Sequence, residues 1–228
     1  MDYKRLYYKY KMKYLTLKEA SLEFKSKLND ENLEKCIPEE FDIKVIDDFL
    51  TTEECIEIIN LAKPILIRSQ VLDDENPISN YRTSSGVFVN SSNHPILKKI
   101  SEKVSEITGI PTDNQEDIQI INYQPGQYYK KHYDACLNDS KECQNDKELG
   151  IRKNTFFVYL NNVKEGGYTA FPNLLRKIVP KAGRAVYWNN VLVNSESFVH
   201  DPCSLHLGVK PDEGEKWALT VWSRIKKN

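Results

Sequence analysis

The chain has 228 residues, with 32 basic and 33 acidic side chains and a formal net charge of -1 at pH 7. This balance argues against a general electrostatic attraction to nucleic acid. No apolar stretch reaches the roughly 18 residues that a membrane-spanning helix needs. We therefore expect one folded domain with a short appendage, long enough to fold without a disulfide or a metal.

The first predicted element is a basic, tyrosine-rich helix within residues 1–37. Its aromatic and apolar residues recur at helical spacing: Tyr7, Tyr10, Tyr14 and Leu17. Such a helix could contact a membrane surface or nucleic acid, but we favour a solvated helix packed by one stripe against the main domain.

The same segment has no apolar core or cleavage site of a secretory signal, so we expect a cytoplasmic protein. In that compartment free thiols are expected at the cysteines, which are Cys36, Cys55, Cys136, Cys143 and Cys203. Their number is odd and no Cys-x-x-Cys pair occurs, so a zinc site of the usual spacing is not expected.

Helices dominate the next region. Phe41 to Phe49 alternates like a strand, with core candidates Ile43, Val45 and Ile46. Thr51 and Glu54 form a capping box that opens a helix carrying Ile56, Ile59 and Leu61 and ending at Pro64. A second helix is predicted from His94-Pro95 to Gly109, because proline suits a first turn and glycine a C-terminal cap.

The rest of the chain is rich in strands. Apolar, β-branched and aromatic runs separated by Gly- and Pro-containing turns predict strands at residues 118–123, 154–160, 185–188 and 217–222. Helices followed by many short strands indicate a mainly β fold with supporting helices (α+β), built as an antiparallel sandwich or barrel.

One pattern in the strand-rich region predicts a metal centre. His132 and Asp134 are two positions apart, so on a strand they would point to the same side. With His206 from a distant strand they would form a two-histidine, one-carboxylate set that leaves three positions of an octahedral ion open. This set suits Fe(II), although affinity alone excludes neither zinc nor manganese. His200 competes with His206 as the third ligand, but it lies in a turn beside Pro202.

Lys216 follows His206 by ten residues, across the turn at residues 211–214. If these segments form a hairpin, Lys216 returns to the same side of the sheet as His206. A buried ammonium would need an anionic partner, such as the distal carboxylate of 2-oxoglutarate. The alternative is an ordinary exposed lysine.

Several further segments occur in order along the chain: Arg82-Thr83-Ser84-Ser85-Gly86, residues 123–129 leading into His132-Tyr133-Asp134, residues 159–161 and 165–172, residues 180–185, and residues 204–208 and 214–222. Together they resemble the prolyl 4-hydroxylase family of 2-oxoglutarate dioxygenases, over about residues 41–224. This resemblance implies a double-stranded β-helix (jelly-roll) core at about residues 117–225. The core would lie within a catalytic domain of residues 38–228.

The resemblance also implies the chemistry and its residues. The enzyme would hydroxylate proline in a peptide or protein, using Fe(II), O2 and 2-oxoglutarate, with ascorbate as reductant. The implied residues are His132, Asp134 and His206 for iron, Lys216, Tyr123, Thr169 and Tyr159 for the co-substrate, and Tyr129, Arg152, Trp222 and Arg82 for the peptide. The same ligands and Lys216 would carry catalysis.

Some features depart from the family pattern or leave alternatives open. Arg224 stands where the last strand often has a histidine, which leaves the peptide preference open. The N-terminal segment resembles leader segments on some proteins of giant DNA viruses, in which case the location would be the host cytoplasm. The alternatives are a dioxygenase acting on another residue or a small molecule, and a non-catalytic module that binds proline-rich peptides. The oligomeric state is not predicted.

Overall fold

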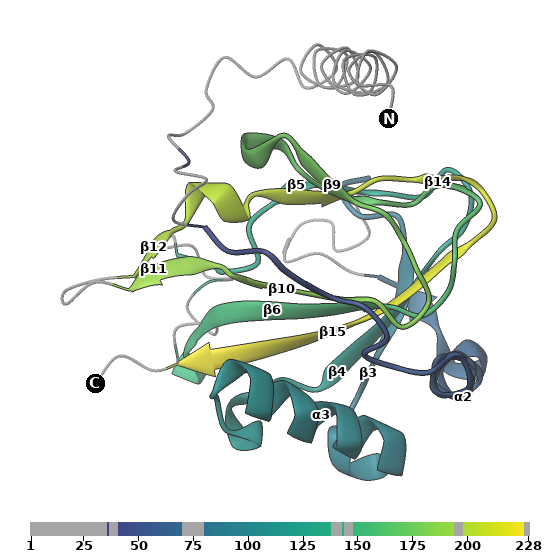
Figure 1. Cartoon of the computed structure of the whole chain (residues 1–228), viewed down its shortest axis with the longest axis horizontal. Helices are drawn as coiled ribbons and strands as arrows, with labels where there is room; N and C mark the ends of the chain where they lie inside the picture. The colour runs from purple at the N-terminus through teal and green to yellow at the C-terminus, as the bar shows by residue number, and fades with distance from the viewer. Residues whose placement is uncertain are drawn as a thin grey trace, which may run out of the picture.

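A computed structural model describes Cys36 and residues 41–69, 80–137, 143, 148–193 and 198–225 of the chain. Within these residues a large antiparallel sheet has helices on one face and a smaller sheet across its other face (Figure 1). None of the described helices is long and apolar enough to span a membrane. The helix predicted within residues 1–37 falls outside the described part, apart from Cys36.

The strands form two sheets that face each other. The large sheet has the order β1 (Lys44–Ile46), β10 (Ala185–Asn189), β6 (Ile151–Tyr159), β15 (Lys216–Ile225), β4 (Ile118–Tyr123), β3 (Ser85–Val89) and β2 (Ile67–Arg68). The small sheet has the order β5 (Tyr129–His132), β13 (His206–Gly208), β8 (Thr169–Phe171) and β9 (Arg176–Ile178). Two further antiparallel pairs join β11 (Val191–Val193) to β12 (Phe198–His200), and β14 (Pro211–Glu213) to β7 (Glu165–Gly166). The predicted mainly β fold with supporting helices is confirmed.

The side chains of β15 alternate between the two faces of the large sheet. Trp217, Leu219 and Val221 belong to the apolar core shared with the helices. Lys216, Thr220 and Trp222 point the other way and line a pocket between the sheets. Because side chains alternate along a strand, one buried strand supplies both the helical core and the pocket wall.

Two α-helices cover the outer face of the large sheet. The capping box of α2 (Thr52–Ala62) is present as predicted, with the Glu54 amide donating to the Thr51 hydroxyl over 3.2 Å. Helix α3 (Pro95–Thr108) begins with proline and ends at Gly109, whose φ of 69° is left-handed. The 3-10 helices are η1 (Lys63–Ile65), η2 (Ser91–Asn93), η3 (Thr112–Asn114), η4 (Pro172–Leu174) and η5 (Pro202–Ser204).

One predicted core residue, Val45, is exposed, and so is one apolar residue of the predicted helix, Ile56. Val45 is 38% exposed and Ile56 is 52% exposed. The buried residues of α2 are Cys55, Ile58 and Ala62, a stripe that begins one position before Ile56. One residue is about 100° of helix rotation, so Ile56 lies beside the buried stripe and not within it.

Candidate active site

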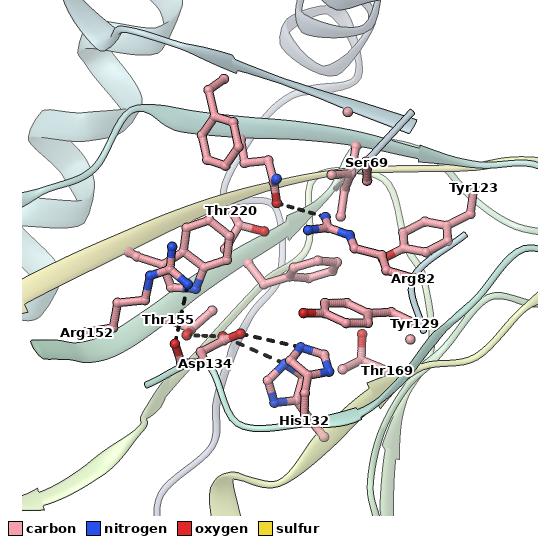
Figure 2. A pocket seen from close by; sticks show the side chains of 18 of the residues that line it. Ser69, Arg82, Tyr123, Tyr129, His132, Asp134, Arg152, Thr155, Thr169 and Thr220 are labelled. Carbon is pink, nitrogen blue, oxygen red and sulfur yellow. Dashed lines mark hydrogen bonds and ion pairs between the residues drawn. The ribbon is translucent and has the colours of Figure 1, made fainter. Parts of the chain in front are cut away.

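The two histidines and the aspartate predicted as metal ligands come together between the sheets. His132 ends β5 and is the register partner of His206 on β13. The Nε2 atom of His132 lies 3.4 Å from Oδ1 of Asp134 (Figure 2), and that of His206 lies 3.7 Å from Oδ2. One ligand atom from each side chain lies within 4.8 Å of the others. Asp134 lies in the loop just after β5, and this loop directs its side chain inward. The strand alternation argued from the sequence therefore does not account for the position of Asp134.

Both imidazole rings are fixed in the same tautomer. Nδ1 of His132 lies 2.7 Å from the Lys130 carbonyl, and Nδ1 of His206 lies 2.9 Å from the Ser204 carbonyl. A carbonyl oxygen only accepts hydrogen bonds, so each Nδ1 carries a hydrogen, and in its neutral form each ring would present the Nε2 lone pair to a metal. The two Nε2 atoms are therefore the ring atoms that could bind a metal beside Asp134.

The charges at this cluster suit a divalent cation. Burial lowers the pKa of His206 to about 4, so its ring is neutral near pH 7. Burial alone would raise the pKa of Asp134, but the His206 and His132 imidazoles and the Thr155 hydroxyl hold it well below its ordinary value. A carboxylate and two imidazoles form a donor set with mixed oxygen and nitrogen, which suits Fe(II).

The cluster opens into a pocket of about 680 Å³, and Lys216 reaches the same pocket from the opposite sheet. The hairpin predicted to bring Lys216 beside His206 is wrong. Strand β14 intervenes and pairs with β7, so Lys216 returns on the large sheet while His206 stays on the small one. The two side chains still converge because the sheets face each other.

Lys216 is 1% exposed, and no carboxylate of the described residues forms an ion pair with it. Its Nζ lies 5.1 to 5.4 Å from the ring centres of Tyr123, Phe157 and Tyr159. Burial lowers the pKa of Lys216 to about 7. A buried ammonium is costly without an anion, so this environment fits a carboxylate of a ligand such as 2-oxoglutarate.

The other residues predicted to bind the co-substrate differ in position. Tyr123 and Thr169 line the pocket. Tyr159 does not line it, and its hydroxyl lies 2.7 Å from Oγ1 of Thr169 and donates to the Ile178 carbonyl over 2.8 Å. The Thr169 amide also donates to this hydroxyl, over 3.1 Å. Tyr159 therefore holds Thr169 in place and packs under Lys216.

All four residues predicted to bind the peptide line the pocket, in two aromatic–arginine pairs. Figure 2 labels three of them, Arg82, Tyr129 and Arg152. The guanidinium of Arg82 lies 4.8 Å from the ring centre of Tyr129, and that of Arg152 lies 4.0 Å from Trp222. Each pair joins hydrogen-bond donors to an aromatic face, an arrangement suited to peptide carbonyls and an apolar ring.

Polar residues that sequence reasoning missed hold these pairs in place. Gln119 accepts from Arg82 over 2.9 Å. Glu116 binds Arg152 over 2.5 and 2.7 Å, and Arg224 lies 2.8 Å from it. Gln119 could have been found from its inward position in the strand of residues 118–123. Glu116 gave no local signal, because its partners are distant in sequence.

His200, the competing third ligand, lies outside the cluster. It sits on β12, and its ring stacks on Tyr133 with the centres 4.4 Å apart. His94 is the N-cap residue of α3, as predicted, and its side chain makes no capping hydrogen bond.

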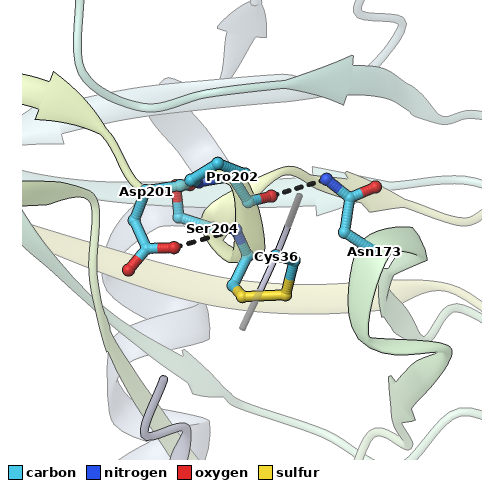
Figure 3. The surroundings of a disulfide bond; sticks show 6 residues. Cys36, Asn173, Asp201, Pro202 and Ser204 are labelled. Atoms are coloured by element: carbon cyan, nitrogen blue, oxygen red, sulfur yellow. Dashed lines mark hydrogen bonds between the residues drawn. A yellow bond between two sulfur atoms is a disulfide. The ribbon is translucent and has the colours of Figure 1, made fainter. Parts of the chain in front are cut away.

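The expectation of free thiols is wrong for four cysteines. Cys36 is bonded to Cys203 in η5 (Figure 3), and Cys136 is bonded to Cys143. Only Cys55 is free among the described cysteines, and it is buried. The cytoplasmic location expected from the sequence therefore loses the support of reduced thiols. The domain boundary near residue 38 stays a prediction, since residues 37–40 are outside the described part.

Comparisons with known proteins identify the family. Residues 118–224 match the 2OG-Fe(II) oxygenase superfamily. A protein of Acanthamoeba polyphaga mimivirus, named as a prolyl 4-hydroxylase, is 38% identical over 184 residues, which is 80% of this chain and 74% of that one. Prolyl 4-hydroxylase 5 of Arabidopsis thaliana is 34% identical over 203 residues, 79% of this chain and 67% of that one.

A solved structure is similar over most of the chain. The viral collagen prolyl hydroxylase vCPH of Paramecium Bursaria Chlorella virus-1, in its 2OG complex, is 30% identical with a TM-score of 0.65. The match covers 82% of this chain and 98% of that one.

The fold and the site define an iron(II)- and 2-oxoglutarate-dependent dioxygenase with a jelly-roll core. The chain belongs to the prolyl 4-hydroxylase family of these enzymes. The predicted family, fold, enzyme class and cofactors are thereby confirmed, and ascorbate is typical of the family. The mimivirus and chlorella virus relatives support a viral origin.

Proposed function

We propose that the protein hydroxylates a proline side chain within a peptide or protein. The reaction would convert proline, 2-oxoglutarate and O2 to hydroxyproline, succinate and CO2. The observation that carries this proposal is that the cluster of His132, Asp134 and His206 faces the buried Lys216 across one pocket. Residues on the two facing sides of the pocket would thus supply both a metal site and an anion site.

The chain's own part is to bind and orient the reactants. His132, Asp134 and His206 would hold Fe(II), which when bound supplies the redox chemistry that side chains lack. Lys216 would bind the distal carboxylate of 2-oxoglutarate, with Tyr123 beside it. Because Lys216 lies deep in the pocket, the keto acid would extend from it toward the metal. Thr169 would pack along the co-substrate, held there by Tyr159.

The peptide would enter past the two aromatic–arginine pairs. Arg82 and Arg152 would donate hydrogen bonds to peptide carbonyls, and Tyr129 and Trp222 would offer ring faces to a pyrrolidine. Their place on the pocket wall supports this role, and the relatives named as prolyl hydroxylases support proline as the target.

The experiment is an assay of succinate with Fe(II), 2-oxoglutarate, ascorbate and a proline-containing peptide. Two peptides, poly-proline and a collagen-like Gly-x-Pro repeat, are compared, and mass spectrometry locates the added oxygen. We expect His132→Ala to abolish turnover. His94→Ala, a histidine variant at the start of α3, is the matched control and should remain active.

The outcomes separate the competing functions. Oxygen found on lysine, asparagine or a free amino acid would replace the proposal with another dioxygenase activity. Peptide binding without succinate formation would support the non-catalytic module. Full turnover by the His132→Ala variant would refute the metal site.

A further inference from the structure

Asn190 is fully buried between β10 and β11, and its side chain reaches toward the candidate metal centre. Its Nδ2 atom lies 3.0 Å from Oγ1 of Thr155 and 3.3 Å from the Arg152 carbonyl. An amide nitrogen has two hydrogens, so these two acceptors use both. The Arg152 carbonyl can only accept, so it fixes which end of the amide carries the nitrogen.

Thr155 links Asn190 to Asp134. Its Oγ1 lies 2.5 Å from Oδ2 of the carboxylate (Figure 2). The Thr155 hydroxyl has one hydrogen and lies near two acceptors, Oδ2 of Asp134 at 2.5 Å and Oδ1 of Asn190 at 3.1 Å. The contact to the charged carboxylate is the shorter one, so Thr155 donates to Asp134 and accepts from Nδ2 of Asn190. The result is a directed chain of two hydrogen bonds that ends on a charged oxygen, where such bonds are strongest.

The backbone of Asn190 supports the other side of the cluster. Its carbonyl accepts from the Asp201 amide over 3.1 Å. The Ser204 hydroxyl lies 3.2 Å from the same carbonyl, although it donates over a shorter distance, 2.7 Å, to the Asp201 carbonyl. Ser204 in turn provides the carbonyl that fixes the His206 ring. One buried residue thus contacts the supports of two of the three proposed ligands.

We propose that Asn190 is a positioning residue that keeps Asp134 a one-oxygen ligand. Because Thr155 occupies Oδ2, Oδ1 is the oxygen left for an ion. If the hydrogen bond to Oδ2 were lost, the carboxylate could turn and offer both oxygens, which would take a coordination position that the co-substrate needs. This inference rests on the proposed metal site and adds a residue outside the family motifs discussed above.

The test measures metal binding without substrate. Co(II), a probe with visible absorption bands, is titrated into the full chain and into its variants. We expect Asn190→Ala to bind Co(II) on the order of 10-fold more weakly, the size of effect seen when partners of metal ligands are removed. We also expect altered Co(II) bands and weaker 2-oxoglutarate binding by the metal-loaded protein.

Variants of Thr155 test the same pair of hydrogen bonds at the end nearer to Asp134. Thr155→Val keeps the shape but removes the hydroxyl, and it should reproduce the loss of affinity. Thr155→Ser restores the hydroxyl and should recover the affinity to within about threefold. This pair keeps the proposal testable if Asn190→Ala does not fold.

The matched control is Asn173→Ala. Asn173 donates to the Pro202 carbonyl over 2.6 Å, so it contacts the same 3-10 turn, η5, without reaching Asp134 (Figure 3). Its Co(II) affinity should match that of the parent. If Asn190→Ala and Thr155→Val only lower the melting temperature and leave Co(II) affinity and bands unchanged, the proposal is overturned. If the parent itself binds no Co(II), the metal site of the proposed function fails instead.

Discussion

Lys216 and Tyr123 are register partners on β15 and β4, and the lysine Nζ lies 5.1 Å from the centre of the tyrosine ring. The aromatic faces around this ammonium stabilise a cation only weakly compared with a carboxylate. The described residues supply no anion for Lys216, so its ammonium group is available to bind an anionic ligand. Its lowered pKa follows from this arrangement and leads to two predictions.

The first prediction concerns co-substrate binding. Burial lowers the pKa of Lys216 to about 7 in the free protein, and a bound carboxylate favours the charged form. Binding should therefore take up a proton, and the 2-oxoglutarate affinity should fall as pH rises above about 7, by at most tenfold per pH unit. Titration calorimetry at pH 8, in two buffers with different ionisation enthalpies, measures the uptake directly. Equal heats in both buffers would contradict it.

The second prediction concerns stability. The pKa of Lys216 is depressed in the folded state, so between about pH 7 and 10.5 the unfolded state binds more protons. The cost of burying the charge is thus full below pH 7 and fades as pH approaches 10.5. We expect Lys216→Met to stabilise the ligand-free protein by about 1 to 4 kcal/mol at pH 6, and less at pH 9. Urea unfolding at both pH values measures this. A destabilised variant at pH 6 would argue against an unpaired charge.

A third prediction follows from Glu116, which holds Arg152 above Trp222. Both side chains of the Glu116–Arg152 pair are less than one-fifth exposed, so the pair is only partly screened by solvent. We expect Glu116→Gln to raise the KM for the peptide by about threefold to tenfold with little change in kcat. Glu213→Gln, which removes an exposed pair with Lys164, is the control. An unchanged peptide KM would show that Arg152 is positioned without Glu116.

A fourth prediction concerns the metal. A ligand that binds only the folded state at 100 times its Kd stabilises the protein by about 2.7 kcal/mol. Fe(II) or Co(II) should therefore raise the melting temperature, and a chelator should reverse the rise. Asp134→Asn should abolish the metal-dependent rise, whereas the exposed Asp113→Asn should keep it. A metal-dependent rise that survives in Asp134→Asn would place the metal elsewhere.

Local patterns in the sequence were sufficient for the elements that carry the site. Pro95 and Gly109 bound α3 because a first-turn proline and a left-handed glycine act within one helical turn. The nearly continuous apolar run of residues 217–222 predicts a strand that is buried on both faces. The ordered motifs around His132 and Asp134 indicated the family and, through it, the jelly-roll fold.

Contacts between residues far apart in the chain could not be predicted in this way. Asn190 is 35 residues from Thr155, and Thr155 is 21 residues from Asp134, so no local pattern joins them. The expected hairpin failed for the same reason: the partner of β14 is β7, a strand some 45 residues earlier in the sequence. That pairing determines which of the two facing sheets carries Lys216.

The bond between Cys36 and Cys203 closes a loop of 167 residues that encloses most of the catalytic domain. In the chain-entropy description, so large a ring stabilises a fold by about 5 kcal/mol through the restricted unfolded chain. The Cys203 end of this disulfide lies in η5, the 3-10 turn next to the carbonyl of Asn190. Loss of this bond would thus loosen the turn whose Ser204 carbonyl fixes the His206 ring. Protein made in a reducing host should be oxidised before its turnover is judged.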